Sequence, residues 1–581
     1  MGDRKTAAPS QWMVQTKRAD FSGIAQKYGI SPVTARIIRN RGVVEDEDIR
    51  KYLSGTLEDM YSPWLLPDMD KAAAIIKQKA EEKASIRVVG DYDIDGVCST
   101  YILLTALKEI GARGDYRIPD RIKDGYGINE AIIRQAAEDG IDTILTCDNG
   151  IAAGEQIALA KELGMTVIVT DHHDIQRSEE EKDILPPADA VVNPKRQDSR
   201  YPYPDICGGM VAYKLMRALY EICAIPLEKW ENMLEFAAVA TVGDVMKLQD
   251  ENRIAVKAGL KQIAYSANPG LRSLIEKNNL DPKALTAYHI GFVIGPCLNA
   301  GGRLQTARLA LELLLAEEKE KADKLADELK ELNEQRKDMT LKGTAEAVEQ
   351  VEKYYRKDKI LVVFLPECHE SLAGIVAGRL REQYQKPAIV LTRAEEGVKG
   401  SGRSIEAYHM FEGLVEVKDL LARFGGHPMA AGLSLAEENV AELRSRLNEN
   451  ARLKEEDFIR KVWIDVPMPV EYINESFIQE LELLEPFGNG NEKPQFAQKD
   501  MTVRSIRVLG RNRNAVKLSL ADPKGFVIDA MIFGDGDSFV EEMGDRNIMD
   551  VIYYPAVNEY NGNRTLQIVI KEYRFSKKSE K

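Results

Sequence analysis

Near its N-terminal end the chain has a short apolar run that leads directly into three aspartates. Residues 86–89 predict a buried strand that ends at a glycine; Asp91, Asp93 and Asp95 follow, and residues 97–108 then predict a helix. Carboxylates this close repel one another, and they suit a hard divalent cation such as magnesium or manganese. Ligands of an open α/β sheet bind beyond the carboxyl ends of its strands. The stretch therefore predicts an α/β fold with a metal site at a strand end.

Three further apolar runs also end in acids or histidines. They are residues 141–146 before Asp148, residues 165–170 before Asp171, His172 and His173, and residues 236–243 before Asp244. For any one such acid taken alone, a structural role as a turn residue or helix N-cap explains it as well as a role in metal binding does. Four runs that end in this way, with two of the chain's six histidines side by side, favour a shared metal site.

The composition is that of an ordinary globular protein with large cores, since 44% of the residues are hydrophobic and 30% are charged. No apolar run approaches the roughly 18 residues of a membrane span, and the N-terminus lacks a signal-peptide core, so we expect a cytoplasmic protein. The six cysteines include no CxxC pair, which argues against a zinc site or a disulfide framework. The net charge of −14 argues weakly against non-specific nucleic-acid binding, although local basic patches decide this.

The order of predicted elements suggests several domains. Residues 1–60 predict a helical segment; a helix-turn-helix outline at residues 21–42 is interpreted as a packing module. Strands alternate with helices over residues 61–270, which is typical of a parallel sheet covered on both faces. Residues 271–352 are a connector. Within it, the stretch between residues 304 and 343 has neither glycine nor proline and predicts one long helix.

Residues 353–455 predict a second, smaller α/β domain, and residues 456–581 predict a β-barrel of five short strands, an OB-like fold. One stretch of the barrel, residues 502–519, has no acid and five basic residues: Arg504, Arg507, Arg511, Arg513 and Lys517. Three tyrosines offer rings on which bases could stack: Tyr553, Tyr554 and Tyr560. We interpret the barrel as a single-strand-binding domain; a solvated barrel with core tyrosines is the alternative.

Other basic and hydroxyl side chains lie among glycines or turn residues, where backbone amides and charged groups can approach a phosphate together. They are Arg121, Lys123, Ser401, Arg403 and His427. A phosphate site and a glycine-rich loop with an incidental charge are both open for each of them. For His427 taken alone, the sequence favours the loop.

Several of these motifs, in their order along the chain, resemble those of the DHH phosphoesterase superfamily. Gly-Asp-Tyr-Asp-Ile-Asp-Gly at residues 90–96, Cys-Asp-Asn-Gly at residues 147–150 and Asp171-His172-His173 look like its successive motifs. Phe-Gly-Gly-His427 is similar to the motif of the DHH-associated domain. Ile-Pro-Asp-Arg121, Gly-Pro-Cys-Leu-Asn-Ala-Gly-Gly-Arg303 and Gly-Ser-Gly-Arg403 look like the RecJ branch. The resemblance covers nearly the whole chain, the barrel included.

The resemblance implies a metal-dependent 5′→3′ exonuclease that is specific for single-stranded DNA, releases 5′-mononucleotides and acts in DNA repair and recombination. It implies a parallel-sheet DHH domain joined by a long helix to the smaller DHH-associated α/β domain, followed by the OB-like barrel. Two divalent ions are implied, with manganese favoured over magnesium because imidazole joins the oxygen ligands. The partner implied is single-stranded DNA; a helicase and a single-strand-binding protein are further candidates.

The resemblance also assigns residues. The two ions are held by Asp93, Asp148, His172 and Asp244, and Asp91 or Asp95 completes the site. Some relatives carry a histidine where this chain has Val89, so which of the first three acids ligate is open. Asp148 would be a bridging carboxylate and His173 would face the substrate, both in catalytic roles. Substrate phosphates would be bound across the cleft between the two α/β domains by Arg121, Arg303, Ser401, Arg403 and His427.

Two other functions are open at this point. One is a DHH-type phosphodiesterase that cleaves short oligonucleotides, cyclic dinucleotides or pyrophosphate; the barrel with its basic stretch argues against it. The other is a non-catalytic DHH scaffold in a replication assembly. The complete set of acids and histidines argues against a scaffold, because such a protein does not need them.

Overall fold

The computed structural model describes residues 10–122, 124–125, 127–395, 397–560 and 562–576, so Lys123 lies outside the described residues. The chain divides into two compact units. The first unit holds residues 45–337 and 486–492, and the second holds the described parts of residues 1–44, 338–485 and 493–581. The five-segment division expected from the sequence stays a prediction.

Five parallel strands form the sheet of the first unit, in the order β3-β2-β4-β5-β6. They are β2 (Ser85–Val89), β3 (Arg113–Arg117), β4 (Thr143–Cys147), β5 (Thr166–Thr170) and β6 (Ala190–Val192). Strands β2, β4 and β5 are those that the apolar runs predict. The strand order reverses between β2 and β4, so the topological switch point, where open α/β sheets bind ligands, lies between these two strands.

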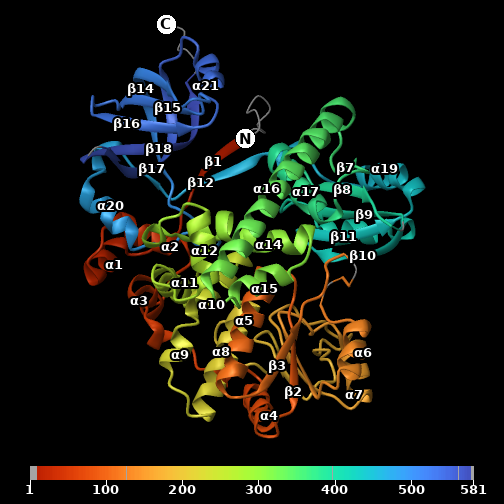
Figure 1. The fold of residues 1–581 in the computed structure, drawn as a ribbon. Coiled ribbons are helices and arrows are strands. Elements are labelled where there is room, and N and C mark those ends of the chain that lie inside the picture. The colour runs from red at the N-terminus through yellow and green to blue at the C-terminus, as the bar shows by residue number, and fades with distance from the viewer. Residues whose placement is uncertain (1–9, 123, 126, 396, 561, 577–581) are drawn as a thin grey trace. The chain divides into compact units, whose positions relative to one another are not determined.

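Helices cover both faces of this sheet (Figure 1). Helices α5 (Ile94–Glu109) and α8 (Gly208–Ile222) pack on one face, and α6 (Glu130–Glu138) and α7 (Gly154–Glu162) pack on the other. Each face has its own hydrophobic cluster. The inner strands are therefore buried on both sides, which explains why their sequences are continuous apolar runs without alternation.

The rest of the first unit is mainly helical. Its helices are α3 (Asp46–Ser54), α4 (Met69–Glu81), α9 (Glu228–Glu231), α10 (Leu234–Gly243), α11 (Asp250–Ile263), α12 (Pro269–Lys277), α13 (Ala287–His289), a π-helical turn at Ile290–Ile294, α14 (Gly295–Leu304) and α15 (Arg308–Leu314). The run before Asp244, which the sequence leaves open as strand or helix, is α10.

The single long helix predicted between residues 304 and 343 is wrong in its bounds. Helix α15 ends at Leu314, and α16 runs over Lys319–Gln350, past Gly343. No glycine or proline causes the break. Leu311 and Leu313 are buried in the core of the first unit, and tertiary packing of this kind overrides local helix propensity. Helix α16 is the long helix that joins the two α/β parts of the chain.

The second unit contains a five-stranded sheet in the order β10-β11-β9-β8-β7. Its strands are β7 (Leu361–Phe364), β8 (Ala388–Arg393), β9 (Val398–Arg403), β10 (Leu421–His427) and β11 (Ala430–Leu435), and its helices are α17 (Glu370–Tyr384), α18 (Met410–Val415) and α19 (Val440–Asn450). Strands β7 and β8 pair in parallel and the others pair antiparallel. The glycine-rich stretches around Arg403 and His427, expected as turns, lie in strands β9 and β10.

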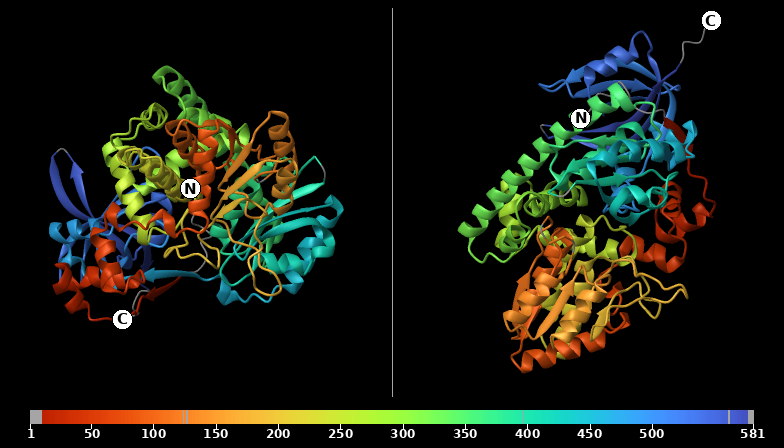
Figure 2. Two further views of the ribbon diagram at one scale, coloured as in Figure 1. Left: turned by 90° about the horizontal axis from the view of Figure 1, so that it is seen from below. Right: turned by 90° about the vertical axis from the view of Figure 1, so that its right-hand side faces the viewer.

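A closed barrel follows in the same unit; it is drawn in dark blue in two further views (Figure 2). Its strands are β14 (Phe496–Leu509), β15 (Ala515–Ala521), β16 (Val527–Phe533), β17 (Ile548–Tyr560) and β18 (Asn563–Phe575), with β13 (Val466–Pro467), α20 (Glu475–Glu482) and α21 (Gly536–Met543) beside them. Pairing of β14 with β17 closes the ring. All five predicted barrel strands are present.

The N-terminal segment also belongs to the second unit. Strand β1 (Ser10–Val14) pairs in parallel with β12 (Arg460–Ile464), and helices α1 (Phe21–Tyr28) and α2 (Pro32–Asn40) follow it. Arg41 donates two hydrogen bonds to the Asp465 carboxylate, at 2.8 and 3.1 Å, as expected of a packing module. No helix in the described part of the chain is both long and apolar enough to cross a membrane.

Candidate metal centre

The structure brings the six predicted metal-ligating residues together at the carboxyl edge of the first sheet. Three of them follow β2, and Asp148 follows β4, the neighbouring strand across the switch point. His172 follows β5, and Asp244 comes directly after α10. The full set is Asp91, Asp93, Asp95, Asp148, His172 and Asp244.

Their side chains form three overlapping groups, and within each group one ligand atom per residue lies within 4.8 Å of the others. The groups are Asp91, Asp93 and Asp148; Asp148, His172 and His173; and Asp95, His172 and Asp244. Asp148 and His172 each belong to two groups, so they lie between neighbouring sites. Groups that share residues in this way can hold two ions side by side.

The surroundings of the His172 imidazole suit a bound cation. Its Nε2 lies 3.1 Å from Asp148 Oδ1, 3.6 Å from Asp95 Oδ2 and 3.7 Å from Asp244 Oδ2. Neither ring nitrogen of this buried imidazole, nor Oδ1 of Asp91, makes a hydrogen bond to any described residue. Buried polar atoms ordinarily have partners. Carboxylate oxygens around an imidazole nitrogen suit divalent ions such as manganese and magnesium.

Burial and mutual repulsion raise the pKa values of the carboxyl groups. The pKa of Asp91 rises to about 8, from burial and then from the charge of Asp93. The pKa of Asp244 also rises to about 8, from burial and then from Asp95. Burial and the same neighbouring acids raise the pKa of Asp148 well above its ordinary value. Carboxyl groups crowd this centre and raise one another's pKa values, and divalent ions would offset their negative charge.

Asp171, the first residue of the triplet, positions its neighbours. Its Oδ1 accepts hydrogen bonds from the backbone N–H groups of His172 and His173 and lies 2.7 Å from His173 Nδ1; its Oδ2 accepts from the Ile151 N–H. Burial lowers the pKa of His173, but the hydrogen bond with Asp171 and the nearby carboxylates outweigh it and raise that pKa to about 9. The sequence places Asp171 among the acids of a shared metal site but predicts no orienting role for it; its position next to two histidines is the signal for such a role.

Asn149 is a second residue to which the sequence analysis assigns no role. Its side-chain amide donates to the carbonyl oxygens of Val89 (3.0 Å) and Cys147 (2.9 Å), which ties together the ends of β2 and β4. Asp148 beside it has a φ of +59°, a left-handed conformation that aspartate and asparagine tolerate better than most residues. Val89, the last residue of β2, is buried in the hydrophobic core.

The three acids after β2 differ in their hydrogen bonds. Both oxygens of Asp95 accept backbone N–H groups, from Gly208 and Gly209 at 2.7 Å each, at the start of α8. This helix N-terminus stabilises the carboxylate charge. Asp93 caps α5 through Oδ1, which accepts two backbone N–H groups. Of these three acids, Asp95 is therefore the one whose hydrogen-bonding capacity the protein itself fills most fully. Each of its oxygens still has a second lone pair that can bind a metal.

Two predicted phosphate-binding residues lie beside the metal centre. The Arg121 guanidinium lies 4.0 Å from the centroid of the ring of Tyr92, a residue of the acidic segment after β2. Burial, and then the neighbouring Arg121, lower the pKa of Arg303 on α14 to about 10, which leaves it charged at neutral pH. Two guanidinium groups this close to each other favour the binding of an anion.

The other three predicted phosphate-binding residues lie in the sheet of the second unit. Ser401 and Arg403 are in β9 and His427 ends β10, and both strands flank β11. Arg403 and His427 are each opposite Ala430 of β11 in the register. A Cβ atom on Gly374 of α17 would lie 2.8 Å from Arg403 Nη2, so the glycine makes room for the guanidinium. The structure thus brings these three residues into one sheet.

The barrel keeps its basic stretch but not the predicted stacking tyrosines. Three of its five basic residues are exposed and form no ion pair with any described residue: Arg504, Arg507 and Arg511. Arg513 and Lys517 pair with aspartates. Tyr553 and Tyr554 are buried, so the prediction that they offer surfaces to bases is wrong; they are core tyrosines. The Tyr560 side chain lies outside the described part of the chain.

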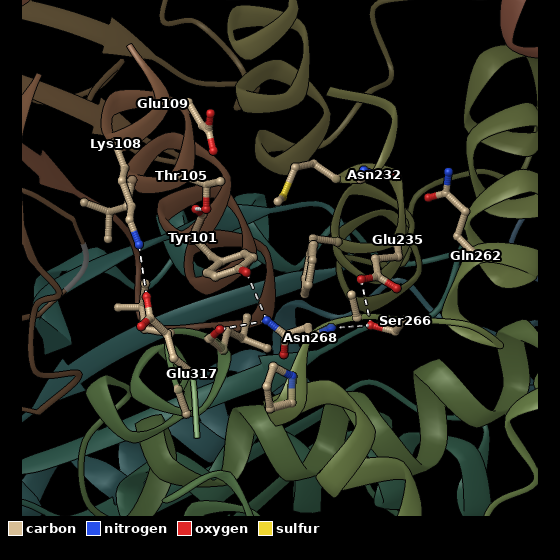
Figure 3. A pocket seen from close by; sticks show the side chains of 18 of the residues that line it. Tyr101, Thr105, Lys108, Glu109, Asn232, Glu235, Gln262, Ser266, Asn268 and Glu317 are labelled. Carbon is tan, nitrogen blue, oxygen red and sulfur yellow. Dashed lines mark hydrogen bonds and ion pairs between the residues drawn. The ribbon is translucent and has the colours of Figure 1, made fainter. Parts of the chain in front are cut away.

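A cavity of about 1230 Å³ lies elsewhere in the first unit (Figure 3). It is walled by the C-terminal half of α5, the start of α10 and residues 265–269. At its wall the buried Glu235 accepts a hydrogen bond from Ser266 at 2.8 Å, and burial raises the pKa of Glu235 to about 7. The described walls include none of the predicted site residues, so this cavity is distinct from the metal centre.

Family models match three segments of the chain. They are the DHH family N-terminal domain over residues 85–241, the DHHA1 domain over residues 357–453 and the RecJ OB domain over residues 464–572. The parallel sheet, its acidic switch point and the first two models define a phosphoesterase of the DHH class.

Individual relatives narrow the class. The chain is 36% identical over 575 residues to the single-stranded-DNA-specific exonuclease RecJ of Bacillus subtilis (strain 168), a match that covers 98% of this chain and 71% of that protein. The crystal structure of RecJ from Thermus thermophilus with Mn²⁺ matches at a TM-score of 0.83 and 28% identity, over 99% of this chain and 80% of that one. Its Mg²⁺ complex matches at a TM-score of 0.76 and 27% identity, over 98% and 79%. The chain belongs to the RecJ family, and the predicted fold class is confirmed.

Proposed function

We propose that this chain is a metal-dependent exonuclease that degrades single-stranded DNA from its 5′ end, releases 5′-mononucleotides and acts in DNA repair and recombination. The observation that carries the proposal is the cluster of buried and half-buried aspartates and histidines at the sheet's switch point, in which burial and neighbouring acids raise the pKa values of the carboxyl groups. Divalent ions held by these residues would make a bound water more acidic and would neutralise charge on a scissile phosphate. The single-strand specificity in the name of the Bacillus subtilis relative supports the substrate.

Two divalent ions are proposed, manganese favoured and magnesium also suitable. Asp91, Asp93 and Asp148 would hold one, and Asp148, His172 and Asp244 the other, with Asp95 completing the set. In the structure Asp148 belongs to two of the three ligand groups, one with Asp91 and Asp93 and one with His172 and His173, which supports a place for its carboxylate between the two ions. RecJ structures with Mn²⁺ and with Mg²⁺ support divalent metals in general.

The protein's own side chains orient the substrate. The His173 side chain is 42% exposed and is held by Asp171, so it can donate a hydrogen bond to a substrate phosphate oxygen. Arg121 and Arg303 would bind phosphate next to the metal centre. Ser401, Arg403 and His427 would bind further phosphate oxygens. Capture of a terminal 5′ phosphate would fix the direction, because each cut then releases one mononucleotide.

The exposed Arg504, Arg507 and Arg511 of the barrel would bind the backbone of the strand. Replacing all three by glutamine should reduce the slope of log K against log salt by about 0.7 for each lost contact. Fluorescence anisotropy of a labelled oligonucleotide at several salt concentrations measures this slope. An unchanged slope would remove the barrel arginines from the binding surface.

The test of the function is digestion of a long single strand, labelled at its 3′ end and phosphorylated at its 5′ end, with manganese. A matching duplex and a dinucleotide are the comparison substrates. Progressive loss from the 5′ end, with the duplex spared, supports the proposal. Cleavage of the dinucleotide alone would assign the chain to small substrates.

A helicase and a single-strand-binding protein are proposed as partners, because the substrate must be kept unpaired.

A further inference from the structure

Two exposed aromatic side chains stack on each other on a helix of the first unit. Tyr288 of α13 and Phe292 of the π-helical turn are 63% and 67% exposed. Their ring centroids are 4.9 Å apart, and the ring planes are inclined by 28°. The His289 ring meets Tyr288 edge-on at 5.8 Å, and its Nδ1 accepts a hydrogen bond from the Thr286 N–H. A single exposed ring is common, but two large rings that are exposed side by side form an apolar patch, and such a patch indicates a binding surface.

The same helical segment leads to the metal centre. It runs without a break from α13 through the π-helical turn into α14. A Cβ atom on Gly291 would lie 3.6 Å from Val242 of α10, two residues before Asp244. Seven residues after Phe292, Asn299 Oδ1 accepts the N–H of Ile94 at 2.8 Å.

The distances place the aromatic pair close to the reaction site. Ile94 lies between Asp93 and Asp95 in the acidic segment. At about 1.5 Å per residue, Phe292 is about 10 Å along the helix from Asn299. A π-helical turn inside a helix is uncommon and frequently marks a functional site. The aromatic pair is thus continuous with the metal centre along one helix.

We propose that Tyr288 and Phe292 form a platform on which unpaired bases of the substrate strand stack beside the metal centre. The proposal rests on the proposed function. Stacking tolerates any sequence, because every base has a π-face. In a duplex both faces of an internal base are covered by its neighbours, so the platform favours single strands. The buried barrel tyrosines Tyr553 and Tyr554 cannot do this.

The test uses the full chain without divalent metal, so that DNA binds without being cut. The probes are 5′-phosphorylated oligonucleotides with 2-aminopurine at successive positions, whose fluorescence falls when the base stacks. Replacing Tyr288 and Phe292 together by alanine should weaken binding about tenfold and abolish quenching at one or two adjacent positions. Tyr288→Phe should keep both. Tyr265→Ala changes a tyrosine of the same unit that is even more exposed (78%); it is the matched control and should change neither.

With manganese, hydrolysis of a dinucleotide separates this proposal from the function itself. A dinucleotide is too short to reach the platform, so the double variant should cleave it at the wild-type rate while digesting long strands more slowly. Wild-type binding, quenching and strand digestion in the double variant would overturn the platform and leave the nuclease intact. A change in oligomeric mass alone would assign the pair to a protein contact and overturn it as well.

Discussion

The first unit buries two groups of charged side chains that differ in the source of their counter-charge. Lys214 and Glu251 are fully buried and form an ion pair at 2.8 Å. The Lys214 ammonium also donates to the Tyr61 carbonyl, and the Tyr201 hydroxyl donates to the Glu251 carboxylate. The metal centre buries acids beside one another, and burial raises their pKa values. Burial of charge therefore indicates function only where the protein does not supply the opposite charge.

The comparison is sharpest at Asp148, because the same change should remove activity and stabilise the metal-free protein. Asn tolerates the left-handed φ of this position and has nearly the same size. We expect Asp148→Asn to lower the rate of strand digestion by at least about 1,000-fold, since a metal ligand is lost. In a chelator it should melt at a higher temperature than the wild type, because a repulsive charge is removed. Wild-type digestion by this variant would contradict the two-metal proposal.

Glu251→Gln should behave in the opposite way. It leaves the Lys214 ammonium buried without its partner, and breaking such a pair costs about 3–5 kcal/mol. We expect the free energy of unfolding of the first unit, measured by urea denaturation, to fall by that amount. The rate of digestion at low temperature should not change. The double change Lys214→Met with Glu251→Leu should recover most of the loss, since apolar groups then replace both charges. A stable single variant would show that the pair contributes little.

Much of the fold and of the candidate site is predictable from the sequence, and the exceptions are contacts between distant segments. Apolar runs that end in acids are local patterns, so strands β2, β4 and β5 and the acids after them could be predicted. That the Asp95 carboxylate accepts N–H groups from Gly208 and Gly209 could not be, because over 100 residues separate them. Nor could the burial of both Tyr553 and Tyr554, since adjacent residues of a strand point to opposite faces and burying both rings requires other segments to cover each face.

Asp171 offers a smaller effect within the metal centre. Its carboxylate accepts three backbone N–H groups and contacts the His173 ring, so its charge is compensated by the protein itself. In this respect it resembles Glu251 of the buried ion pair, although it lies beside the metal centre. Asp171→Asn should lower strand digestion about 10–100-fold, the usual range for residues that orient ligands. Manganese affinity, measured by calorimetry, should fall by a similar factor. A fall in stability with unchanged metal affinity would make Asp171 a purely structural residue.

The smallest expected effect is the pH dependence of stability without metal. The pKa values of Asp91 and Asp244 rise to about 8 and that of His173 to about 9, all above their unfolded values, so the folded state holds protons that the unfolded state has lost. Stability must then fall as pH rises from about 6.5 to 8, by at most about 1.4 kcal/mol per pH unit for each proton. The lowered pKa of His172 acts in the opposite sense, but only below about pH 6.5.

Thermal melts in a chelator measure how stability changes with pH, and added manganese should flatten this slope, because metal replaces the protons. A flat profile in the chelator would mean that the acids stay ionised together without a cation, and the contrast with the Lys214–Glu251 pair would then fail.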